Sequence, residues 1–120
     1  MKIFKYLCAI TFAAIFSSTV MAETFSVADV HTKRVEFAGK QVTVIGKVVK
    51  VNNGIMRRNF IHLQDGTGSG NNDRVIITSQ QTANIGEQVT VTGTLTLDTD
   101  FTMGYVYPTL LTKASITSVN

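Results

Sequence analysis

Basic and aromatic residues gather in the middle of the chain in a combination suited to holding a single strand of nucleic acid. Two adjacent arginines, Arg57 and Arg58, come just before Phe60. Arginine and lysine neutralise phosphates and an aromatic ring offers a stacking surface, so the combination favours binding over catalysis. In the flanking segments, alternation of inward and outward residues along the expected strands adds further members. The predicted ligand-binding set is Phe60, His62, Gln64, Arg57, Arg58, Lys47, Lys50, Tyr105 and Tyr107.

Most of these residues also have a purely structural explanation. Phe60 fits as a cap on one end of a folded domain, and the four cations fit as solubilising side chains. Tyr105 and Tyr107 fit as packing on the wall of the domain, and His62 fits as a half-exposed residue. The sequence leaves both explanations open.

No arrangement of residues in the sequence predicts catalysis. His62 has no Ser or Cys nucleophile motif beside it, and Asp98 and Asp100 suit a hairpin turn better than an acid–base pair. The segment Gly66–Gly70 has the composition of a phosphate-binding loop, but it lacks the Gly-Lys-Ser/Thr ending and precedes a strand. We therefore expect a protein that is not an enzyme and needs no cofactor.

Copper binding is a minor alternative. Met56, His62 and Met103 offer thioether and imidazole groups, which suit Cu(I). Their spacing is not that of a compact metal motif, and methionine also fills apolar gaps. The sequence therefore predicts no metal site.

The first 22 residues have the pattern of a cleavable export signal. Lys2 and Lys5 precede an apolar run at residues 6–16, and small residues at Val20 and Ala22 suit signal peptidase. We expect a signal peptide at residues 1–22, a single domain at residues 23–120 and a periplasmic location. A run of about 11 apolar residues is too short for the ~20 that span a bilayer, so we expect no membrane anchor after cleavage.

Removal of this leader changes the charge of the chain. The full sequence has 11 Lys and Arg against 8 Asp and Glu, a formal net charge of +3. Without Lys2 and Lys5 the net charge is +1, and Cys8, the one cysteine, leaves with them. Thiolate catalysis and cysteine-bound zinc are thereby excluded from the mature chain. Attraction for phosphate would have to come from a local cluster of cations.

Alternating hydrophobicity predicts an all-β domain behind one short helix. Ser26 and Asp29 make a capping-box pattern for a helix that ends by Gly39. The apolar face changes parity at Val48, which predicts a β-bulge, and Asn52-Asn53-Gly54 predicts the turn that follows. The expected strands are Gln41–Val51, Phe60–Asp65, Val75–Thr78, Gln88–Leu97 and Tyr105–Leu111, with a tail at Ile116–Val119.

Two segments, Gly39–Val48 and Gly86–Leu95, share the pattern G-x-Q-V-T-V-x-G-x-[V/L]. Two copies do not make a repeat protein. We interpret them as two strands under the same geometric demand, each needing its second glycine, Gly46 or Gly93, where it bends strongly. Five strands with such bends predict a small closed barrel that leaves no exposed edge.

The order of these motifs resembles the OB fold over roughly residues 26–114. The resemblance is closest to the nucleic-acid-binding, tRNA-anticodon-binding-like group and to small exported bacterial OB-fold proteins. Some of the latter accompany periplasmic cytochrome nitrite reductase systems. One departure is that residues 79–85 are too few for the usual helix between the third and fourth strands. The motifs that carry the resemblance are Gly39-x-x-Val42-x-Val44-x-Gly46-x-Val48, Phe60-Ile61-His62-Leu63-Gln64-Asp65-Gly66-Thr67-Gly68 and Gly86-x-x-Val89-x-Val91-x-Gly93.

The resemblance implies a five-stranded Greek-key barrel that binds ligands across its second and third strands, framed by the loops after its first and fourth. With Ile61 and Leu63 in the core, the alternate residues of the second strand face that surface, and the loop at residues 98–104 brings Phe101 and Met103 to its rim. The sequence thus predicts a periplasmic, non-enzymatic module that binds a protein or small ligand. The alternative is a module that binds single-stranded DNA or RNA.

Overall fold

The structure is a computed structural model that describes residues 22–101 and 104–119. Residues 1–21 of the predicted signal peptide, and Met103 of the predicted rim, lie outside this part. Within these described residues, no helix is long and apolar enough to cross a membrane. The elements are β1 (Glu23–Phe25), α1 (Val27–Thr32), β2 (Gln41–Ile55), β3 (Arg58–Gln64), the 3-10 helix η1 (Gly70–Asn72), β4 (Val75–Ser79), β5 (Gln88–Asp100) and β6 (Val106–Ser118).

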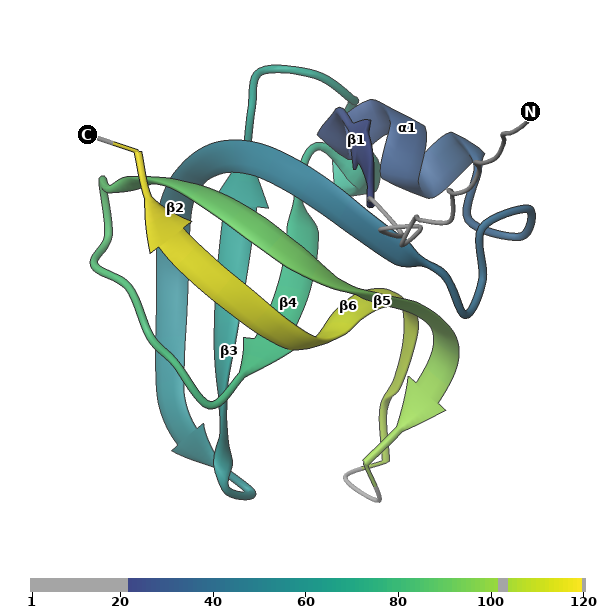
Figure 1. Ribbon diagram of the computed structural model, residues 1–120. Helices are drawn as coiled ribbons and strands as arrows, with labels where there is room; N and C mark the ends of the chain where they lie inside the picture. Colours follow the sequence, from purple (N-terminus) through teal and green to yellow (C-terminus); the bar gives the residue numbers. More distant parts are fainter. Residues whose placement is uncertain (1–21, 102–103, 120) are drawn as a thin grey trace, which may run out of the picture.

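The strands form one sheet that closes on itself (Figure 1). Their order is β1-β2-β3-β4-β6-β5, and β2 also pairs with β5. Strand β2 pairs with three strands: β1 pairs with Val42–Val44, β5 pairs with Gln41–Lys47, and β3 pairs with the part from Lys47 onward. The prediction of an all-β fold with one short N-terminal helix is confirmed.

Strand β2 changes partners where it bends. A Cβ on Gly46 would lie 2.9 Å from the carbonyl oxygen of Gln64, so only glycine allows β3 to approach this closely. Directly afterwards the β2–β3 register shifts between Val48 and Lys50. The predicted β-bulge is therefore confirmed.

The predicted turn at Asn52-Asn53-Gly54 is wrong. These residues belong to β2, and the chain reverses at Met56 and Arg57, whose φ angles are 50° and 66°. Two successive positive φ angles give the twist that a tight hairpin needs. The Asn-Asn-Gly segment instead coincides with a second register shift, between Asn52 and Ile55.

Two further boundaries differ from the prediction. The expected strand Tyr105–Leu111 and the expected tail are one strand, β6, which begins at Val106 and continues through a register shift against β5 between Thr92 and Thr94. Strand β5 continues to Asp100, so β5 and β6 form a longer hairpin than expected, paired as far as Asp100 and Val106.

The two copies of the shared sequence pattern are partners in the sheet. Gly39 N–H donates to Leu95 O at 2.7 Å, and at the equivalent place Gly86 N–H donates to Val48 O at 2.8 Å. The repeated pattern therefore reflects a local twofold relation between β2 and β5, and each second glycine faces a valine of the other copy. The central opposed pairs are Val42–Gly93, Val44–Val91 and Gly46–Val89.

Helix α1 packs over the interior and is held by the Asp-Gly-Thr turn after β3. The capping box of Ser26 and Asp29 is present as predicted. The Asp65 carboxylate accepts from Val27 N–H at 2.9 Å, and the Thr67 hydroxyl accepts from Ala28 N–H at 3.0 Å. The fully buried core beneath comprises Val27, Val30, Val42, Val44, Val48, Ile61, Leu63, Val75, Ile77, Val89, Val91, Leu95 and Leu111.

Candidate ligand-binding site

The β2–β3 hairpin and the β5–β6 hairpin project from the same end of the sheet, at the lower left and lower right of Figure 1. Between their bases and the end of β4 lies a hollow of about 490 Å³, which we call the hairpin hollow. Among the described residues that line it, none is acidic. The lining residues are Arg58, Thr78, Ser79, Gln80, Gln81, Phe101, Thr112, Lys113 and Ala114.

An aromatic cluster borders this hollow. The Phe60 ring lies 5.6 Å from Phe101 and 5.7 Å from Tyr107, and Tyr107 lies 4.8 Å from Tyr105 at an interplanar angle of 88°. The Phe60–Phe101 and Tyr105–Tyr107 contacts are edge-to-face and the Phe60–Tyr107 contact is tilted, and together they hold each ring in one orientation. The cluster joins the middle of the sheet to the β5–β6 hairpin.

Phe60 points away from the core, as its alternation with the buried Ile61 and Leu63 predicts. It is nevertheless only 3% exposed, because Phe101 and Tyr107 cover it. The ring predicted to stack on a ligand is therefore a support. Phe101 and Tyr107, which lie above it, are half-buried and more accessible.

Two cations face the hairpin hollow from opposite strands. The Arg58 guanidinium carbon lies 4.5 Å from the centre of the Phe101 ring, within the range of a cation–π contact. Lys113 lies at the register shift of β6 and has a φ of 52°. A bulge of this kind redirects a side chain, and Lys113 joins the lining here. The neighbouring Arg57 is exposed at the hairpin turn.

Side-chain amides fix the walls of the hollow. Gln80 Nε2 donates to Arg57 O at 2.8 Å, which ties the end of β4 to the β2–β3 hairpin. Gln81 Oε1 accepts from Ile116 N–H at 2.8 Å, and the Ser79 hydroxyl donates to Ala114 O at 2.6 Å. These contacts hold the site in place before any ligand arrives, which lowers the entropic cost of binding.

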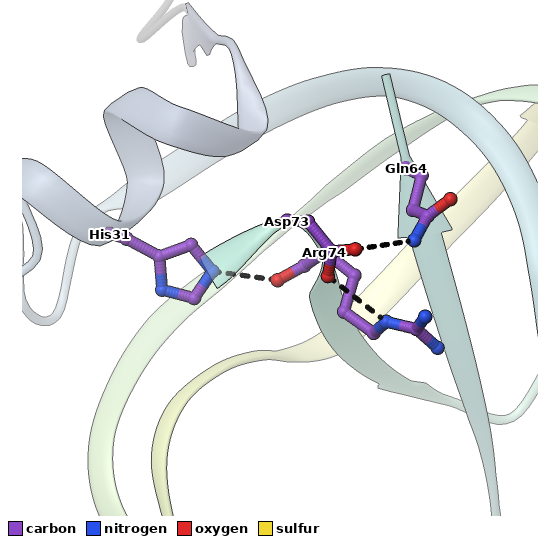
Figure 2. Close-up of polar contacts among 4 residues, drawn as sticks. All are labelled: His31, Gln64, Asp73 and Arg74. Carbon is purple, nitrogen blue, oxygen red and sulfur yellow. Dashed lines mark hydrogen bonds and ion pairs between the residues drawn. The ribbon is translucent and has the colours of Figure 1, made fainter. Parts of the chain in front are cut away.

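The structure divides the predicted set. Arg58 lines the hairpin hollow and Phe60 and Tyr107 support it, but the other members of β2 and β3 lie further along the outer face. Lys47 is opposite Gln64 and Lys50 is opposite His62 in the β2–β3 ladder. Gln64 Nε2 donates to Asp73 Oδ2 at 3.0 Å (Figure 2). Tyr105 is 57% exposed and faces a different hollow, on the far side of the cluster.

Sequence reasoning missed Thr78, Gln80, Gln81 and Lys113. The two glutamines follow a strand in a segment that has no distinctive pattern. Lys113 faces the hollow only because of the shift between β5 and β6, two strands whose pairing no local motif reports. The rim position of Phe101, by contrast, was predicted from the loop that carries it.

His62 occupies a half-buried, electropositive place on the outer face. Its Nδ1 atom is buried and finds no hydrogen-bond partner among the described residues. Burial, followed by the positive charges of Lys50 and Arg74, lowers the pKa of His62 from 6.5 to about 4. The imidazole is therefore neutral at pH 7.

Replacement of His62 by glutamine should flatten the acid side of the stability profile. Between pH 6.5 and about 4, the unfolded chain binds a proton at His62 that the folded chain does not bind. Wild-type stability should therefore fall as the pH drops through this window. The urea midpoint of His62→Gln should fall less than that of the wild type between about pH 7 and about pH 4.5. Lys50→Ala removes one positive neighbour and should therefore narrow the pH range over which stability falls. If the urea midpoint changed equally with pH in all three proteins, His62 would not be the group responsible.

No group of three His, Cys, Asp or Glu side chains gathers in the described part where it could hold a metal ion. Of the copper candidates, Met56 lies at the turn of the β2–β3 hairpin and His62 lies within β3. Met103 lies outside the described residues. Copper binding therefore stays an untested alternative.

No family model matches the chain, and no curated protein matches it. Solved structures with a similar arrangement do match, and three of them follow. A candidate aspartyl-tRNA synthetase from Leishmania major Friedlin has a TM-score of 0.57 and 17% identity, over 90% of this chain and 23% of that one. An OBody bound to hen egg-white lysozyme has a TM-score of 0.61 and 14% identity, over 84% and 98%. A candidate nucleic acid-binding lipoprotein from Klebsiella pneumoniae has a TM-score of 0.54 and 17% identity, over 80% and 92%.

The chain thus spans about a quarter of the synthetase that it matches. At identities this low a shared fold does not carry a shared function. The narrower resemblance to exported companions of nitrite reductase systems stays a prediction. What the comparisons establish is that the chain has an OB-like, all-β fold.

Proposed function

We propose that this protein is a binding module that performs no covalent chemistry and holds its partner in the hairpin hollow. The observation that carries the proposal is the hollow itself, which is lined by Arg58, Lys113 and Phe101 and by no acidic residue among those described. Guanidinium and ammonium groups beside an aromatic ring suit a partner with an anionic or planar group. The amide contacts of Gln80 and Gln81 keep this surface in one shape.

The partner we favour is a protein or small ligand met after export. The leader pattern at residues 1–22 supports an extracytoplasmic location, and a net charge of +1 without that leader argues against broad affinity for polyanions. An OBody of similar fold is bound to hen egg-white lysozyme, which supports protein recognition as a use of such a fold.

Single-stranded nucleic acid is the second candidate. Residues 41–64 contain four Lys and Arg and no Asp or Glu, so positive charge is spread along β2 and β3. Aromatic surface beside positively charged strands suits stacked bases and phosphates. With so few cations, binding should be weak and should fall steeply as salt rises.

Site-specific photo-crosslinking in cells that produce the full chain tests the proposal. A photoreactive residue at Gln80 lies on the rim of the hollow, and the same residue at Val35, which is 74% exposed, lies elsewhere. We expect one discrete adduct at position 80, lost with Arg58→Ala and retained with Lys40→Ala. Equal labelling at both positions, or none, would show that the hollow is not the contact surface. The crosslinking is repeated in an extract of these cells; if a dT oligonucleotide abolishes the adduct there at low salt and not at moderate salt, nucleic acid uses the same hollow.

A further inference from the structure

A second hollow lies on the other side of the aromatic cluster. It has a volume of about 620 Å³, and none of its lining residues lines the hairpin hollow. Helix α1, the loop before β4 and the start of β6 enclose it. The residues used below are His31, Arg34, Arg74, Ile76, Tyr105 and Tyr107, all of which line it.

Hydrogen bonds tie the three enclosing segments together. A ring nitrogen of His31 lies 2.6 Å from Arg74 O, which joins α1 to the loop before β4 (Figure 2). Arg34 Nη1 donates to Pro108 O at 3.1 Å, which joins the segment after α1 to β6. The hollow is thus a fixed feature of three distant parts of the chain, and it does not depend on one mobile loop.

The charge of the hollow favours an anion. Arg34 and Arg74 both line it, and Asp73 is the one carboxylate among its described lining residues. That carboxylate already accepts from Gln64 Nε2 at 3.0 Å and from Arg74 Nε at 3.4 Å. The bond to Pro108 occupies one of the five N–H donors of Arg34. Planar guanidinium groups form bidentate hydrogen bonds with phosphate and carboxylate groups.

The aromatic part of the lining favours a planar ring. Tyr105 is 57% exposed, yet its edge-to-face contact with Tyr107, at 4.8 Å, holds the ring in place. Ile76 adds an apolar surface beside these rings. An aromatic ring of this kind stacks on a nucleobase or another flat ring. A volume of 620 Å³ suits a small organic ligand better than a bare inorganic ion.

We propose that this second hollow binds a small anion that carries an aromatic ring, a mononucleotide being the representative of the class. The anionic group pairs with Arg34 and Arg74, and the ring stacks on Tyr105. The site does not depend on the proposed function of the hairpin hollow, because different residues form it.

Isothermal titration with adenosine 5′-monophosphate, adenosine and inorganic phosphate tests the proposal. The monophosphate should bind, and adenosine and phosphate should each bind at least about tenfold more weakly because each lacks one recognition element. A 5′-phosphorylated oligonucleotide distinguishes a free nucleotide from the end of a nucleic-acid strand as the natural ligand. Binding tighter than that of the monophosphate assigns the site to a strand end, and equal or weaker binding assigns it to a free small molecule.

Three variants locate the site. Tyr105→Ala and Arg34→Gln should each weaken monophosphate binding about five- to tenfold, and Arg34→Lys should restore part of it. Lys113→Ala, in the hairpin hollow, should change it less than about twofold. Thermal unfolding of each variant checks that it is folded. No binding at millimolar monophosphate would overturn the proposal, as would binding that a folded Tyr105→Ala variant retains or that Lys113→Ala weakens equally. None of these results bears on the crosslinking at Gln80.

Discussion

Replacement of Gly46 by alanine is expected to lower the free energy of unfolding by about 2 kcal/mol, although it adds a single carbon. The new Cβ would lie 2.9 Å from Gln64 O, 3.4 Å from the carbonyl carbon of Gln64 and 3.5 Å from Leu63 Cβ. The first two are backbone atoms of β3, which no rotamer change can move. Alanine in a strand is otherwise slightly favourable over glycine, so a loss would isolate this contact.

Urea unfolding of the folded domain measures the effect. Ile45→Ala serves as the control because the Ile45 side chain lies on the same strand and is 44% exposed. We expect this variant to lose less than about 1 kcal/mol. If Gly46→Ala were as stable as the wild type, the close approach of β2 and β3 would not be a constraint on the fold.

Replacement of Asp65 by alanine is expected to destabilise the protein by about 2–3 kcal/mol. The carboxylate accepts from Val27 N–H at 2.9 Å and from Thr67 N–H at 3.0 Å, so it holds both the turn after β3 and the first turn of α1. The change would leave these N–H groups without their charged acceptor. It should also loosen the packing of Val27 and Val30, which helix α1 places in the core.

The pH dependence of Asp65 separates its charge from its shape. Burial raises the pKa of Asp65, but hydrogen bonds from the Thr67 hydroxyl, Val27 N–H and Thr67 N–H outweigh burial and leave the pKa below its ordinary value. The carboxylate therefore stabilises the fold above the ordinary carboxyl range, and this contribution is lost as the pH falls through the folded pKa. This window lies below the one assigned to His62.

Asp65→Asn is the matched variant, since it keeps the size of the side chain and removes the charge. It should lose less stability than Asp65→Ala at neutral pH. In acid Asp65→Asn should remain more stable than Asp65→Ala, whereas the wild type should lose the stability that its carboxylate contributes at neutral pH. Urea midpoints at about pH 7 and about pH 3 check this. Wild-type stability of both variants at neutral pH would show that hydrogen bonding to this carboxylate does not hold α1.

Local patterns predicted the parts of the fold that neighbouring residues determine. The capping box depends on Ser26 and Asp29, three residues apart, and the inward positions of Ile61 and Leu63 follow from strand alternation. The bulge near Val48 was predicted because the alternation of apolar residues changes parity there. Each of these features is encoded within one turn or one strand.

Features that depend on two distant segments were missed. The Asn52-Asn53-Gly54 segment has a turn pattern but pairs with β3 as part of β2, and Asn59 Oδ1 there accepts from Gly54 N–H at 2.9 Å. The cover over Phe60 comes from Phe101, on a hairpin remote in the sequence. The candidate set was therefore predicted as one surface, whereas the structure distributes it over two hollows and the strand face beside them.

The aromatic cluster gives the protein a built-in optical reporter. The sequence has no tryptophan and three tyrosines, of which Tyr6 lies outside residues 23–120. Tyr105 and Tyr107 are therefore the sole strong ultraviolet emitters of residues 23–120, and their rings stand 4.8 Å apart. A molecule that settles against either ring would change the emission of the whole chain, so occupancy can be followed without attaching a dye.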